Sequence, residues 1–150
     1  MAAYRFDDRA IDWAPFNGFE GLYYSIQSVD RELNRVDMLM KFDPNTNCVP
    51  HTHVGVTKTL VLEGEHRIYK PGPDGALGAP DIRPAGTFSE NRGDETHVEG
   101  GGPDGTIILL SMQAVEGDVY DILREDLTLD RKITLDNFAR GLERQRARAD

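Results

Sequence analysis

Glycine and proline interrupt this chain at short intervals, which limits the length of any regular element. The 150 residues include 15 glycines and 8 prolines, and most of them stand in clusters such as Gly18–Gly21, Pro71–Gly75 and Gly100–Gly105. Both residue types break helices and strands, so the segments between the clusters have the length of strands. This pattern favours an assembly of many short strands joined by turns.

Between the clusters, hydrophobic residues recur with the period of two that is typical of a half-buried strand. Over residues 35–42, apolar side chains alternate with charged ones, and only Leu39 breaks the alternation. The preceding segment, Leu22–Val29, is rich in aromatic and β-branched residues. We therefore predict that these two segments form a hairpin through residues 30–34.

Two glycine-containing segments further along are predicted to be turns, and the segments beside them are predicted to be strands. Thr59–Leu62 is expected to turn at Glu63–Gly64 into a second strand at Arg67–Tyr69. The run Gly100–Gly105 is expected to form a wide hairpin loop, and Thr106–Leu110 a strand that is buried on both faces.

Helical signals occur only near the end of the chain. Thr134 can cap a helix in which Leu135, Phe138, Ala139 and Leu142 recur at helical spacing, although Gly141 weakens it. Eight or more short strands followed by one helix predict an all-β fold, a small antiparallel barrel or jelly roll with a C-terminal helix.

Composition limits the binding partners and the cellular location that can be expected for this chain. The net charge of −9 disfavours nucleic acid and anionic membrane as partners. No segment is apolar enough for a membrane span, and the first 13 residues carry five charges where a signal peptide needs an apolar core. We expect a cytoplasmic protein whose single cysteine, Cys48, is a small buried residue or, alternatively, a reactive thiol.

Two histidines are spaced for metal binding. His51 and His53 are separated by one residue, so on a strand both imidazoles project from the same face and can reach one ion. The alternative is a pair of polar residues beside a turn. A third histidine, His97, lies 46 residues beyond His51, and distant strands of a jelly roll can face each other across the interior.

These segments resemble the two sequence motifs of the cupin superfamily. Val49–His53 followed by Leu60–Gly64 is similar to the first motif, and Pro84–Phe88 followed by Gly93–His97 is similar to the second. The resemblance covers roughly residues 38–112. It implies one cupin domain over residues 1–150, with a barrel core at about 21–125, an N-terminal arm at 1–20 and a helical tail at 134–150. It also implies that His51, His53 and His97 are metal ligands.

The chain departs from both motifs. Thr57 stands where the first motif usually has a metal-binding glutamate, and Gly101 stands where the second usually has asparagine. A threonine hydroxyl is a poor ligand for a divalent metal, which favours a site of three histidines. Glu95, two residues before His97, could be a fourth ligand, a group that orients an imidazole or a solvated turn carboxylate. We expect His66 to lie outside the ligand set.

Cupins with three histidines and no motif glutamate include acetylacetone-cleaving (β-diketone) dioxygenases and dihydroxyacetophenone dioxygenases. The resemblance implies Fe(II), although Zn, Ni or Mn can occupy such a site in purified protein. It also implies O2 and a small substrate that chelates iron as a β-diketone enolate or hydroxyaryl ketone and undergoes carbon–carbon cleavage. Three neutral imidazoles would leave the cation both of its charges, which favours an anionic substrate.

Two other functions share this fold and most of these ligands: a metal-binding cupin that senses or binds a small molecule without turnover, and a metal-dependent isomerase or lyase.

The aromatic residues near the N-terminus are expected to cover the barrel or a homodimer edge, with substrate stacking as the alternative. They are Trp13, Phe16, Phe19, Tyr23 and Tyr24.

Overall fold

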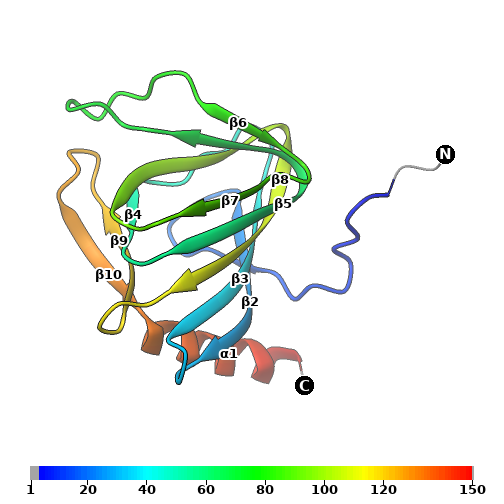
Figure 1. Cartoon of the computed structure of the whole chain (residues 1–150). Coiled ribbons are helices and arrows are strands. Elements are labelled where there is room, and N and C mark those ends of the chain that lie inside the picture. The colour runs from blue at the N-terminus through cyan, green and yellow to red at the C-terminus, as the bar shows by residue number, and fades with distance from the viewer. Residues whose placement is uncertain (1–3, 150) are drawn as a thin grey trace.

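The computed structural model describes residues 4–149, and within them the chain forms ten strands and one C-terminal helix (Figure 1). The elements are β1 (Ala14–Pro15), β2 (Leu22–Asp30), β3 (Arg35–Phe42), β4 (His51–His53), β5 (Thr57–Tyr69), β6 (Asp81–Pro84), β7 (Phe88–Asn91), β8 (Glu95–Gln113), β9 (Asp118–Leu123), β10 (Leu129–Thr134) and α1 (Leu135–Ala149).

The strands form a curled antiparallel jelly roll in which β8 connects two sheets. The C-terminal half of β8 pairs with β3, and β3 continues the sheet through β2 to β1. The N-terminal end of β8 pairs with β4, which continues the other sheet through β9 to β10. The sheets face each other across the interior, and α1 crosses one end (Figure 1). This confirms the predicted all-β jelly roll with a C-terminal helix.

The predicted hairpin is also confirmed. β2 and β3 pair from Leu22 opposite Phe42 to Asp30 opposite Arg35. The alternating apolar side chains of β3 point into the core, as the period of two requires. Leu39 is buried as well, on the opposite face, which explains why an apolar residue breaks the alternation there.

Two of the predicted turns are wrong, for one physical reason. β5 is a single strand that pairs with β8 on both sides of Gly64, and the Gly100–Gly105 run lies inside β8. Gly64 and Gly105 both have φ of 75°, and they meet at a register shift of this strand pair. Positive φ at these glycines bends two long paired strands together instead of reversing either one.

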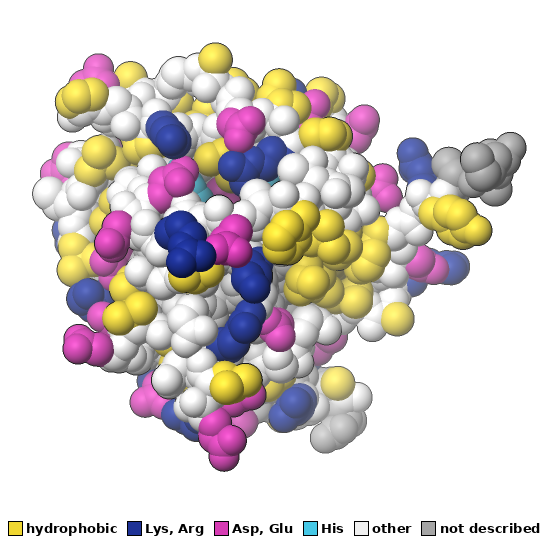
Figure 2. Space-filling view, viewed as in Figure 1, with side chains coloured by type: hydrophobic (Ala, Val, Ile, Leu, Met, Phe, Trp, Pro, Cys, Tyr) yellow, Lys and Arg dark blue, Asp and Glu magenta, His cyan; other side chains and the backbone are white. Residues whose placement is uncertain are grey.

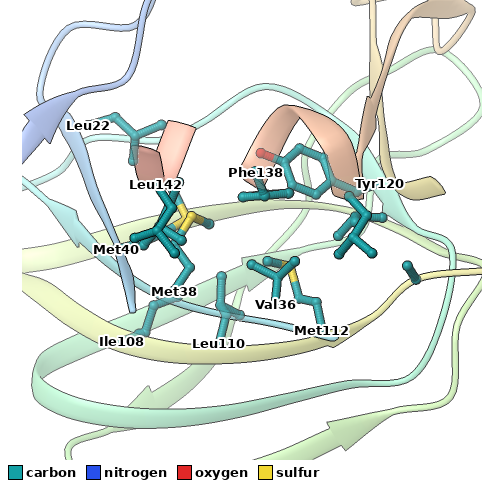
Figure 3. Close-up of a cluster of buried hydrophobic side chains, with 14 of the residues drawn as sticks. Leu22, Val36, Met38, Met40, Ile108, Leu110, Met112, Tyr120, Phe138 and Leu142 are labelled. Atoms are coloured by element: carbon teal, nitrogen blue, oxygen red, sulfur yellow. The ribbon is translucent and has the colours of Figure 1, made fainter. Parts of the chain in front are cut away.

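The core lies between the sheets and under the helix (Figure 3). Buried side chains of β3 and β8, including three methionines, face Tyr120 of β9 and the apolar side of α1 (Figure 3). Gln145 of α1 is bonded to β2 in both directions, because its amide donates to the carbonyl of Ile26 and its Oε1 accepts the N–H of Ile26, each at 2.9 Å. The helix therefore covers apolar surface and also provides hydrogen-bond partners for the backbone N–H and carbonyl of Ile26 in β2.

The helix begins where the sequence predicts. The hydroxyl of Thr134 accepts the N–H of Asn137 at 3.2 Å, as expected of a capping residue. Gly141 faces β2 so closely that a Cβ there would lie 2.9 Å from Cδ1 of Ile26, so the residue that weakens the helix permits its close packing. No helix in residues 4–149 is long and apolar enough to cross a membrane.

Candidate metal centre

Strand pairing brings the three predicted histidines together. β4 lies between β8 and β9, and His51 stands opposite His97 in the β4–β8 register. His53 follows on the same face of β4. The ring centroids of His51 lie 4.9 Å from His53 and 4.7 Å from His97, and His53 lies 5.1 Å from His97. All three are buried in the interior of the barrel.

A fourth residue, Glu99, completes a histidine–glutamate cluster. One ligand atom from each of His51, His53, His97 and Glu99 lies within 4.8 Å of the others. Glu99 is 3% exposed, and its Oε2 lies 3.1 Å from Nε2 of His51. Glu99 is not among the candidate site residues predicted from the sequence. It stands two residues after His97 and therefore projects from the same face of β8.

The hydrogen bonds of these side chains suit a bound cation. Nδ1 of His51 lies 3.0 Å from the carbonyl of Val49, an arrangement that leaves Nε2 directed into the cluster. Both ring nitrogens of His53 and Nδ1 of His97 are buried without a hydrogen-bond partner among the described residues. Unpartnered buried nitrogens are costly, and a metal ion would satisfy one nitrogen of each imidazole that binds it. The donor set of imidazoles and one carboxylate therefore fits a divalent transition metal.

The electrostatics of the site keep two imidazoles in the form that binds metal. Burial, together with the neighbouring charge of His51, lowers the pKa of His53 to about 3. Burial also lowers the pKa of His97 to about 4. Burial alone would raise the pKa of Glu99, but His97, His51 and His66 outweigh it and lower that pKa well below its usual range. Glu99 is thus a carboxylate at neutral pH.

The pKa values of His53 and His97 predict an acid-sensitive metal-free protein. Both lie below the ordinary 6.5, so the unfolded chain takes up protons that the folded chain does not. This contribution to stability is complete above about pH 6.5 and is lost as the pH falls toward the folded pKa values, at up to about 1.4 kcal/mol per pH unit for each group.

Denaturant unfolding of metal-free protein between pH 6.5 and 4.5 measures this slope. Burial alone would lower the pKa of His51, but Cys48 and Glu99 outweigh it and raise that pKa, so His51 is protonated in both states over most of the window and adds little to the slope. His53→Phe should show a clearly smaller slope than the wild type. Equal slopes in the two proteins would contradict the shift assigned to His53.

Two residues singled out from the sequence lie at the margin of the cluster. Glu95 is opposite His53 on β4, and its Oε1 is 3.7 Å from Nδ1 of His97. Its other oxygen accepts a hydrogen bond from Asn91 at 2.6 Å. Thr57 is buried beside the cluster, and its hydroxyl lies 3.5 Å from the carbonyl of Gly55. Neither side chain belongs to the group of four.

Two further side chains contact the cluster from outside. The Sγ of Cys48 accepts the N–H of Glu99 at 3.3 Å and lies 3.6 Å from Nδ1 of His51, so this half-buried cysteine packs behind two cluster residues. His66 of β5 is fully buried, and its Nε2 lies 3.2 Å from Oε1 of Glu99.

The cluster separates two cavities of different chemistry. An apolar cavity of about 30 Å³ adjoins His51, His53 and Glu99. The side chains that line the rest of it include Phe16, Phe19, Met38, Met40, Leu110, Met112 and Tyr120. A second cavity, of about 60 Å³, reaches His53, His97 and Glu99 from the other side and is lined by polar groups of β5, β7 and β8 and by Arg83 of β6.

A histidine side chain is visible at the bottom of a hollow between acidic and basic side chains on the face that β5, β6 and β7 cover (Figure 2). The polar cavity extends from His53 and His97 to Arg83 and Glu90, whose side chains are partly exposed. On the other side, Phe16 and Phe19 of the N-terminal segment line the apolar cavity and pack against the core. Two of the five aromatic residues near the N-terminus, Phe16 and Phe19, thus lie against the barrel next to the cluster.

Solved structures with the same fold include dioxygenases. A proposed acetylacetone dioxygenase from Methylibium petroleiphilum PM1 matches with a TM-score of 0.70 and 15% identity, over 95% of each chain. The acetylacetone dioxygenase from Acinetobacter johnsonii matches with 0.70 and 13%, over 95% of this chain and 90% of its own. An RmlC-like cupin protein from Ralstonia eutropha JMP134 matches with 0.71 and 16%, over 98% and 89%.

No protein-family model matches the sequence, and no curated protein matches it significantly. The structural matches extend over nearly the whole chain, and they agree with the two curled sheets joined by β8. The chain therefore has the cupin fold.

Proposed function

We propose that this protein is a mononuclear non-haem Fe(II) dioxygenase that cleaves a carbon–carbon bond of a β-diketone or hydroxyaryl ketone. The observation that carries the proposal is the buried histidine–glutamate cluster, whose unpartnered imidazole nitrogens adjoin an apolar cavity. The two acetylacetone dioxygenases of the same fold support this choice of chemistry.

The cluster would hold the iron through His51, His53, His97 and Glu99. When bound, Fe(II) supplies a Lewis acid for two substrate oxygens and the redox chemistry that O2 requires. Glu99 changes the electrostatics expected from three histidines alone, because its carboxylate leaves the loaded site with one net positive charge instead of two. A substrate that binds as a monoanion makes this buried site neutral, which avoids an uncompensated charge in the barrel.

The residues around the apolar cavity would then orient the carbon skeleton. Met38, Met40 and Met112 are unbranched and adaptable, so they can fit closely around a small alkyl or aryl substituent. Phe16 and Phe19 on the same cavity exclude water from the reacting carbons. The polar cavity on the opposite side gives small molecules a route from the surface to the cluster.

Anaerobic titration of the Fe(II)-loaded protein tests this function. Addition of a 1,3-diketone or a 2-hydroxyaryl ketone should produce a visible charge-transfer band, and admission of O2 should bleach it while carboxylate products form and oxygen is consumed. Metal-free protein and His53→Ala should show neither effect. If the loaded protein binds no ligand of a broad panel, or binds ligands without consuming oxygen, the dioxygenase proposal is wrong and a non-catalytic binding protein is favoured.

A further inference from the structure

His66 occupies a position that the proposed ligand set does not explain. It lies on β5, opposite Gly101 of β8, and its side chain is fully buried. The ring packs near Phe42, with the centroids 6.3 Å apart. Its Nε2 is 3.2 Å from Oε1 of Glu99 without hydrogen-bond geometry toward it, and neither ring nitrogen has a hydrogen-bond partner among the described residues. Burying an imidazole without hydrogen bonds costs free energy. The position of His66 beside the buried carboxylate of Glu99 therefore suggests a role for this side chain.

The two oxygens of Glu99 face different neighbours. Oε2 lies 3.1 Å from Nε2 of His51, whereas Oε1 lies 3.2 Å from Nε2 of His66 and 3.8 Å from Nε2 of His97. One oxygen is thus directed to a member of the cluster, and the other to a histidine outside it. An N–H group on Oε1 would occupy one of its two lone pairs and hold the carboxylate in an orientation that directs Oε2, not Oε1, at the cation.

How many oxygens Glu99 contributes determines how much room a ligand has. With three imidazoles and one carboxylate oxygen, an octahedral cation keeps two positions free, as a chelating ligand requires. With both carboxylate oxygens bound, only one position is free. Carboxylates can bind in either way, so some group has to fix the choice.

We propose that His66 is a positioning residue: a small rotation of its ring lets Nε2–H donate to Oε1 of Glu99, and this hydrogen bond restricts Glu99 to binding a cation through Oε2. This proposal rests on the metal centre under the proposed function but does not depend on which reaction the centre catalyses. The conclusion concerns coordination number, so it can be tested by spectroscopy with Co(II) as the probe.

The test compares the wild type with His66→Phe, which has no donor, and His66→Gln, whose amide can donate to Oε1. Co(II) is titrated into metal-free protein while the visible absorption spectrum is recorded. His66→Phe should alter the Co(II) spectrum, because both oxygens of Glu99 can then bind, and should change the affinity about 10- to 100-fold; His66→Gln should restore most of the wild-type spectrum. If His66→Phe does not fold, His66→Met replaces it, since it has no donor and is unbranched.

Val61→Ala is the matched control, because Val61 is a buried residue of the same strand that belongs to the hydrophobic core. It should lose stability without a change in the Co(II) spectrum. Glu99→Ala gives a second comparison: if His66 acts through Glu99, adding His66→Phe to Glu99→Ala should change Co(II) affinity less than about twofold.

The outcomes separate the two proposals. Wild-type spectrum and affinity in His66→Phe would overturn the role of His66 while leaving the metal centre in place, and so would an undiminished effect of His66→Phe in the Glu99→Ala background. Failure of the wild type to bind Co(II) would overturn both proposals. Normal Co(II) results without oxygen consumption by the iron form would overturn only the dioxygenase.

Discussion

His53→Leu is expected to abolish stoichiometric metal binding and, at the same time, to stabilise the metal-free protein. Both ring nitrogens of His53 are buried without a partner among the described residues, and burial lowers its pKa to about 3. Leucine removes a metal ligand, which should weaken binding by more than about 100-fold, since even groups that only orient a ligand contribute 10- to 100-fold. It also removes the unsatisfied polar atoms, which should raise the free energy of unfolding by about 1–3 kcal/mol.

Elemental analysis after anaerobic Fe(II) loading and denaturant unfolding of the metal-free protein measure the two effects. Thr52→Val is the control, because Thr52 lies between His51 and His53 on β4 but pairs its hydroxyl with that of Thr96 at 2.6 Å. This control should keep the metal. Full metal content in His53→Leu and in the alanine variants of His51 and His97 would refute the assignment of the centre.

Gly64→Ala is expected to be the most destabilising small substitution in the barrel. A Cβ at this position would collide with the backbone carbonyl of Gly105, and Gly64 has a positive φ of 75°. Positive φ costs an alanine about 1–2 kcal/mol, and a clash with backbone forces the β5–β8 pair to shift, so a total loss of about 3 kcal/mol or more is expected. The melting temperature should fall by about 6–12 °C.

Gly86→Ala separates the two contributions. Gly86 also has a positive φ, of 92°, but no atom lies within 4 Å of the position that its Cβ would take. It should lose only the conformational part, about 1–2 kcal/mol. Equal melting temperatures for the two variants would show that the approach of Gly64 to Gly105 is not needed for the bend in β5 and β8.

The bend at Gly64 also shows where sequence reasoning reaches its limit. Alternation of apolar and charged residues defines β3 and its hairpin with β2, because both strands are neighbours in the chain and one face is buried. A glycine with positive φ is equally compatible with a hairpin turn and with a bulge inside a long strand. The partner strand decides between them, and for Gly64 the partner lies about 40 residues away in β8.

The candidate site, like the fold, was predictable from the sequence only in part. His51 and His53 share a face on any strand, and the second cupin-like motif identifies His97. Glu95 and Glu99 are each two residues from His97, so periodicity treats them equally. The register places Glu95 opposite His53 at the end of β4, with a third of its side chain exposed, whereas Glu99 continues into the barrel beside His51 and His66. Only the folded register distinguishes the two carboxylates.

The central position of β8 has a consequence for folding kinetics. β8 brings His97 and Glu99 to β4 only when it has docked against strands that are distant in the chain, so we expect the ligand set to be assembled late in folding. A cation that binds only the completed arrangement stabilises the native state and not the folding transition state. It therefore slows unfolding and leaves the refolding rate nearly unchanged, which makes the lifetime of the native barrel depend on metal supply.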